Sequence, residues 1–161
     1  TFGVGELAPE RAALSEATRS EMWDGIAAAK VGARIGDISH AIETSVRTGK
    51  AGLGIVAEYT GHVIGRAMHQ HQDVPNVGRP GRGDLLVKGM CLAVEPMVTL
   101  GSAATAVLED DWTVVTRDGS AAAHWEHTVA ILPDGLWVLT ALDGGAGELA
   151  ARGARYAPLG E

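Results

Sequence analysis

The chain has only one cysteine among its 161 residues, Cys91, which excludes a framework of internal disulfide bonds and favours a reducing compartment. No apolar run approaches the roughly 20 residues that cross a bilayer, and we see no signal-peptide pattern. Positive charge is also scarce. The 13 lysines and arginines against 20 aspartates and glutamates give a net charge of -7, which argues against binding to nucleic acid phosphates. We therefore expect a cytoplasmic protein that binds neither membranes nor nucleic acid.

The residues that are present are typical of a globular α+β domain. Hydrophobic residues make up 46% of the chain and charged residues 20%. Helix formers with apolar residues at roughly helical spacing predict one helix within residues 7–30, ending near Gly32. Residues 36–49 predict a second, shorter helix with Asp37 as its N-cap. Segments rich in β-branched and aromatic residues then predict a mostly antiparallel sheet, with strands within residues 53–65, 89–100, 110–120, 122–132 and 135–142.

Turn-forming residues mark the connections and the tail. The stretch "DVPNVGRPGRGD", residues 73–84, predicts a surface loop, and "PDG" at 133–135 predicts a hairpin turn. We expect the domain to occupy residues 1–143. The tail at 144–161 is rich in glycine and alanine and predicts either a frayed terminus or a weak last helix.

Three ionisable residues lie inside strand-like segments, where apolar neighbours should be buried: His62 in "GHVIG", Glu95 in "LAVEPM" and Glu126 in "HWEHTV". Burying a lone carboxylate costs several kcal/mol unless the group is paired or bound to a metal. Each residue taken singly is best explained as a buried polar group with a hydrogen-bond partner. Three on neighbouring strands favour instead a site for Mn²⁺, Fe²⁺, Co²⁺ or Zn²⁺, with one or two ions.

Four of the other histidines divide into one candidate and three residues to which we assign no role in a site. His69 lies at the mouth of the glycine-rich loop, where it could steady an oxyanion or a substrate carbonyl, or could simply be solvated. We interpret His71 as a solvated loop residue and His40 as a helix-surface residue. His127 should point to the sheet face opposite Glu126, since strand side chains alternate, and we interpret it as structural.

Four segments in order, "YTGHVIGRAMHQHQDVPN", "LVKGMCLAVEPMV", "DDWTVVTRDGSAAAHWEHTV" and "LWVLT", resemble the second half of a type I methionine aminopeptidase of the pita-bread fold. The resemblance implies a reaction in which initiator methionine is hydrolysed from the N-terminus of a nascent protein. It implies that His62, Glu95 and Glu126 bind metal, Glu126 as the bridging ligand, and that Glu95 also accepts a proton. It further implies that His69 contacts the substrate and that Trp112 lines the methionine pocket.

The sequence also departs from the family pattern. The family uses two further aspartate ligands from the first half of the fold, which this chain lacks, so we expect a complementary N-terminal half or self-association. Met68 stands in place of a phenylalanine and could still touch a methionine side chain. His124 stands in place of a glutamine; we interpret it as a packed polar residue, with an added metal ligand or a donor behind the ligands as the less favoured interpretation. A non-catalytic module that binds proteins and a prolidase-like Xaa-Pro peptidase remain the alternatives.

Overall fold

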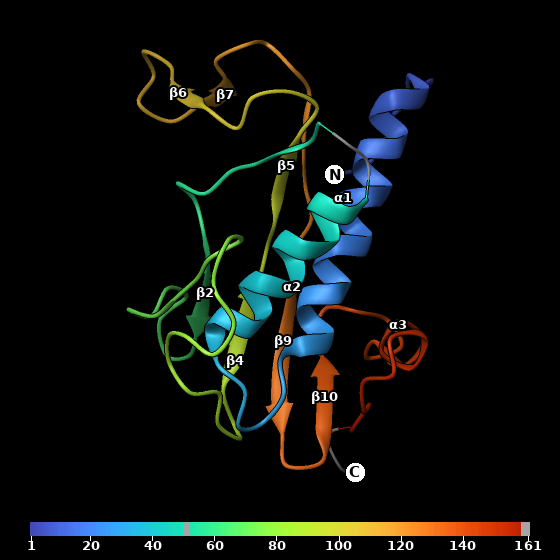
Figure 1. Ribbon diagram of the computed structural model, residues 1–161, viewed down its shortest axis with the longest axis vertical. Coiled ribbons are helices and arrows are strands. Elements are labelled where there is room, and N and C mark those ends of the chain that lie inside the picture. The colour runs from blue at the N-terminus through green and yellow to red at the C-terminus, as the bar shows by residue number, and fades with distance from the viewer. Residues whose placement is uncertain (50–51, 159–161) are drawn as a thin grey trace.

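A computed structural model describes residues 1–49 and 52–158, and it shows two long helices lying side by side against an antiparallel sheet (Figure 1). Helix α1 spans Pro9–Ala28 and α2 spans Ile35–Thr48. The helices pack closely where Gly25 of α1 meets Ile42 of α2, since a Cβ added at Gly25 would lie 2.6 Å from an Ile42 carbon. The predicted α+β class is therefore confirmed.

Helix α2 begins earlier than the sequence suggested. Its N-cap is Arg34, so the prediction that Asp37 caps the helix is wrong. The Asp37 carboxylate reaches back to accept hydrogen bonds from the backbone N–H of Arg34 at 2.7 Å and of Gly81 at 2.7 Å. An aspartate three residues inside the helix completes a capping box, and here it also fastens the glycine-rich loop to the helix.

The strands form two sheets and a separate hairpin. The five-stranded sheet has the order β10-β9-β4-β2-β3, the smaller sheet has the order β1-β5-β8, and β6 pairs with β7. Every pairing between these strands is antiparallel. The strand bounds are Gly54–Ile55 (β1), Gly61–Ile64 (β2), Asp73–Val74 (β3), Cys91–Val94 (β4), Met97–Thr99 (β5), Thr105–Val107 (β6), Val114–Thr116 (β7), Ala122–His124 (β8), His127–Leu132 (β9) and Gly135–Val138 (β10).

Several predicted segments are confirmed and two strands were missed. The turn at 133–135 joins β9 to β10 as a hairpin. Strand β3 lies within the stretch predicted as a loop, and β6 lies outside every predicted strand. Both are two or three residues long with weak alternation of polar and apolar residues, so their pairing depends on neighbours and leaves little trace in the sequence.

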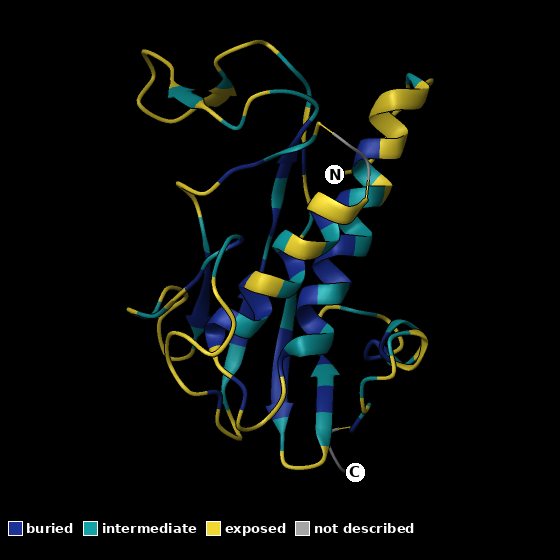
Figure 2. Cartoon of the chain, in the orientation of Figure 1, coloured by how far each residue is buried: buried dark blue, intermediate teal, exposed yellow. Residues whose placement is uncertain are grey.

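The core lies between the helices and one face of the sheet. Leu92 and Val94 of β4 and Val129 and Ile131 of β9 are fully buried against it. The helix surfaces facing the sheet are buried and their outer surfaces exposed (Figure 2). Since strand side chains alternate, the residues between these apolar positions point to the other face, which neither α1 nor α2 covers.

Part of the glycine- and alanine-rich tail forms a short helix, α3, at Ala146–Ala151. Leu149 is buried in the core, and Arg152 fastens this helix to α1: its Nε donates to Asp24 at 2.7 Å, and its guanidinium also bonds Glu148 and the Ser20 carbonyl. The tail thus contributes to packing over its described length. The boundary at residue 143 stays a prediction. No helix of the described ranges is long and apolar enough to span a membrane.

Candidate metal centre

Glu95 and Glu126 lie where two paired strands leave one sheet and enter the other. Val94 pairs with His127 across β4 and β9, and Met97 pairs with His124 across β5 and β8. The same register therefore continues through the gap and sets Glu95 opposite Glu126. Directly opposite residues in an antiparallel pair project to the same face. Pro96, which has no N–H for a ladder, follows Glu95 and lies at the break between β4 and β5.

The same register brings His62 and His124 to this face. His62 of β2 pairs with Ala93, which lies two residues before Glu95 and so shares its face. His124 lies two residues before Glu126 and shares that face for the same reason. Ala93 is small, so no bulky side chain stands between the imidazole of His62 and the carboxylate of Glu95.

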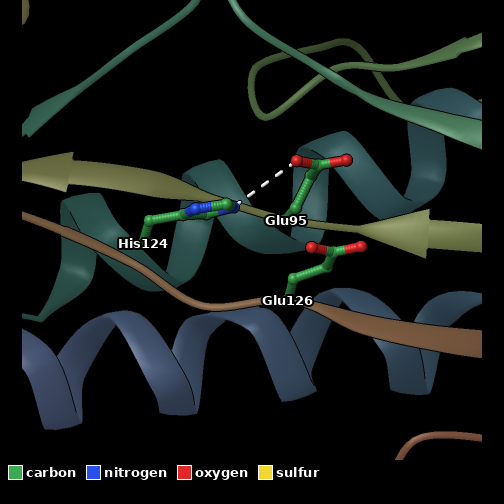
Figure 3. A group of neighbouring side chains, drawn as sticks. All are labelled: Glu95, His124 and Glu126. Carbon is green, nitrogen blue, oxygen red and sulfur yellow. Dashed lines mark ion pairs between the residues drawn. The ribbon is translucent and has the colours of Figure 1, made fainter. Parts of the chain in front are cut away.

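The distances confirm that these groups meet. Nε2 of His62 lies 3.6 Å from Oε1 of Glu95, and Nε2 of His124 lies 3.4 Å from Oε2 of the same carboxylate. Glu95, His124 and Glu126 each offer a ligand atom, and these atoms all lie within 4.8 Å of one another. Figure 3 shows His124 directed toward Glu95, with the carboxylate of Glu126 beside it.

The donor set fits a divalent cation. Two carboxylates share one small volume, and among the described residues neither forms an ion pair with a lysine or an arginine. Their like charges repel, and a cation between them would remove that repulsion. Carboxylate oxygens together with imidazole nitrogens suit borderline first-row metals.

Comparisons with known proteins agree with this geometry. Residues 1–133 match metallopeptidase family M24. The chain belongs to this family. It is 56% identical over 144 residues to methionine aminopeptidase 1 of Mycobacterium tuberculosis, covering 87% of this chain and 54% of that protein. It is 49% identical over 140 residues to the methionine aminopeptidase of Clostridium acetobutylicum, covering 87% of this chain and 55% of that protein.

A solved M24 structure confirms the pita-bread fold that the sequence predicted. The methionine aminopeptidase of Thermotoga maritima superimposes with a TM-score of 0.82 at 42% identity, covering 86% of this chain and 55% of that chain. The chain thus spans about half the length of the relatives that it matches.

In this M24 chain, Trp112 lines a cleft that also contains Glu95 and His124. The cleft has a volume of ≈ 700 Å³, and its walls include Tyr59, Met97 and Val114. Trp112 is 86% exposed and sits in the connection between β6 and β7. Hydrogen bonds from Thr113 and from the Trp112 backbone lower the pKa of Asp110 and hold this connection in shape.

His69 lies close to a candidate ligand, whereas Met68 lies outside the cleft. The ring of His69 is 4.3 Å from that of His62, centre to centre, so the structure brings it beside this imidazole. Met68 is 68% exposed and is not among the residues that line the cleft. The roles of both residues stay predictions.

The remaining histidines lie as their positions suggested, with one exception. His40 and His71 are exposed. His127 packs on Trp23, with ring centres 4.9 Å apart, and burial lowers its pKa. The exception is His124, which we interpreted from the sequence as a packed polar residue. Its side chain is 46% exposed and meets Glu95. The sequence pattern does indicate this position, because strand alternation alone places His124 on the same sheet face as Glu126.

Proposed function

We propose that the chain contributes to the metal-dependent removal of N-terminal methionine from proteins by hydrolysis. The observation that carries this proposal is the opposition of Glu95 and Glu126 on one sheet face beside two imidazoles. The similarity to methionine aminopeptidases supports the choice of reaction within the family.

His62, Glu95 and Glu126 would hold one or two ions of Co²⁺, Mn²⁺, Fe²⁺ or Zn²⁺. A divalent cation supplies Lewis acidity there: it lowers the pKa of water and polarises the scissile carbonyl. Glu95 accepts the proton from the attacking water, and His69, beside His62, donates a hydrogen bond to the carbonyl oxygen as negative charge develops.

The apolar part of the cleft is the proposed site for the methionine side chain. Trp112, Val114 and Met97 supply apolar surface there, and Glu95 lies in the same cleft. A methionine held by these residues would place the following peptide bond near the carboxylates. Met68 would approach the substrate only if the exposed segment 65–69 moved toward the cleft. The proposed cellular location is the cytoplasm, where nascent chains are made.

The site needs further ligands to hold metal tightly. The family resemblance implies two aspartates that this chain does not supply. We propose that a complementary N-terminal half, or a second copy of the chain, covers the sheet face that α1 and α2 leave open. The exposed apolar residues beside this face, among them Trp112 and Val114, support such a contact.

The test measures free methionine released from a Met-Ala-Ser peptide by the purified chain, with each of the four metals added in turn. We expect metal-dependent release, and loss of at least 100-fold in Glu126→Gln. Glu10→Gln, which changes an exposed glutamate in the first turn of α1 that does not line the cleft, is the matched control and should behave like the wild type.

Three results would contradict the proposal. Equal release by Glu126→Gln would identify a contaminating peptidase. Folded, metal-loaded chain that releases no methionine, either alone or after a complementary N-terminal half is added, would favour the binding-module alternative. Faster release of the first residue from Ala-Pro-Ser than from Met-Ala-Ser would favour the Xaa-Pro peptidase.

A further inference from the structure

His124 and His62 both reach the carboxylate of Glu95. The two imidazoles approach different oxygens: His62 faces Oε1 at 3.6 Å and His124 faces Oε2 at 3.4 Å. Only His124 belongs, with Glu95 and Glu126, to the group whose ligand atoms all lie within 4.8 Å. Glu95 is thus positioned to serve two neighbouring places, one beside each imidazole.

The backbone of His124 is held firmly although its side chain is half exposed. The Thr1 hydroxyl donates to the His124 carbonyl at 2.9 Å and accepts from the His124 N–H at 2.9 Å. On its other edge, His124 pairs with Met97 in the β5–β8 ladder. Strand pairing and the threonine therefore hold the backbone that carries the imidazole without burying the ring, which leaves Nε2 accessible to a ligand.

The separations fit a shared ion better than a direct hydrogen bond. The 3.4 Å between His124 and Glu95 is longer than the 2.7–3.2 Å of ordinary N–H···O bonds. Donor atoms that share a tetrahedral cation at about 2.0–2.2 Å lie roughly 3.3–3.6 Å apart. The imidazole and the carboxylate are thus spaced as two ligands of one ion. Figure 3 shows the carboxylate of Glu126 next to that of Glu95.

We propose that His124 is a metal ligand, which with Glu95 and Glu126 forms a second cation position distinct from the one beside His62. This position takes a borderline divalent cation such as Zn²⁺ or Co²⁺ in preference to Mn²⁺, because it offers imidazole as well as oxygen. The proposal rests on the proposed function, since both use Glu95 and Glu126.

The experiment follows Co²⁺ binding to the purified chain by equilibrium dialysis and by proton NMR of the histidine rings. Co²⁺ is the probe because its unpaired electrons shift the ring signals of a directly bound imidazole far outside the ordinary range. We expect His124→Gln to bind Co²⁺ at least 10-fold more weakly and to lose one set of shifted imidazole signals. His40→Gln removes an exposed histidine from α2 and should match the wild type in both measurements.

The outcomes separate this proposal from the proposed function. If His124→Gln keeps the affinity and all shifted signals while Glu126→Gln loses Co²⁺, the second position is refuted and the metal centre stands. If His124→Gln binds more weakly but no ring signal of His124 is shifted in the wild type, its role is structural and the proposal fails. If the wild type binds no Co²⁺, or Glu126→Gln binds as well as the wild type, both proposals fail. Circular dichroism confirms that each variant is folded.

Discussion

A buried carboxylate in α1 gives the sharpest prediction about stability. Glu21 is 3% exposed, and within the described chain its Oε2 atom is buried with no hydrogen-bond partner. Burial, and then the negative charge of Asp24, raise the pKa of Glu21 from 4.5 to about 7. We predict that Glu21→Gln stabilises the protein at alkaline pH, because glutamine keeps the size of the side chain and removes its charge.

The magnitude follows from the difference between the folded and unfolded pKa. Between pH 4.5 and about 7 the folded chain binds more protons than the unfolded chain, so its stability falls as pH rises through this window. Above pH 7, the difference between a folded pKa of about 7 and an unfolded pKa of 4.5 corresponds to about 3 kcal/mol of lost stability. The stabilisation by Glu21→Gln should therefore be near zero at pH 4.5 and about 3 kcal/mol at pH 8.

Urea denaturation of the wild type and of Glu21→Gln at pH 4.5, 6 and 8 measures this difference. Glu109→Gln serves as the control, since Glu109 is exposed and should give a difference that does not grow with pH. A Glu21→Gln effect that is the same at all three pH values would refute the reasoning, because a pKa shift cannot act without a pH dependence.

Three further predictions test other parts of the fold by thermal or urea unfolding. Arg152→Ala should destabilise the chain by about 1–2 kcal/mol, because it removes the ion pairs to the partly exposed Asp24 and Glu148, whereas Arg155→Ala, at an exposed pair 3.8 Å long, should change stability by less than about 0.5 kcal/mol. Equal effects would contradict this. Gly61→Ala should destabilise the chain, since the new Cβ would lie 2.2 Å from the Ala93 carbonyl oxygen. Gly147→Ala in α3 should stabilise the chain by about 0.5–1 kcal/mol, because alanine favours a helix more than glycine does. A Gly147→Ala variant less stable than Gly61→Ala would refute this reasoning. Burial lowers the pKa of His127 below 6.5, so the folded protein loses stability as the pH falls from 6.5 toward the lower pKa of the folded state. His127→Gln should reduce this loss of stability at acid pH, and an unchanged dependence of stability on pH would contradict the prediction.

The sequence indicated which side chains share the candidate face because strand periodicity is local. His62, Glu95 and Glu126 each stood out as ionisable residues among apolar neighbours, and alternation placed His127 on the opposite face. Their convergence depends on register between strands far apart in the chain. Periodicity does not specify register, so the order of the motifs and the family resemblance had to supply it.

The failures have a common physical origin. Asp37 was assigned as an N-cap because aspartate favours that position, but its contact with Gly81 comes from a loop 44 residues away. His124 was interpreted as packed, although exposure is decided by what covers a face, and a single strand carries no record of that. Strand β3 and the burial of Glu21 likewise depend on tertiary neighbours.

The unbroken register between the β4–β5 and β8–β9 segments divides the chain into lengths that can vary and lengths that cannot. One residue added within 91–97 would turn either Glu95 or its apolar neighbours to the wrong side of the sheet. Residues added in the connection between β5 and β8 would leave both carboxylates where they are. Natural variation in chain length, and any insertion of a tag or a binding loop, should therefore collect in the connections that flank the projecting β6–β7 hairpin, outside the turn that carries Trp112, where a change in length does not reach the two glutamates (Figure 1).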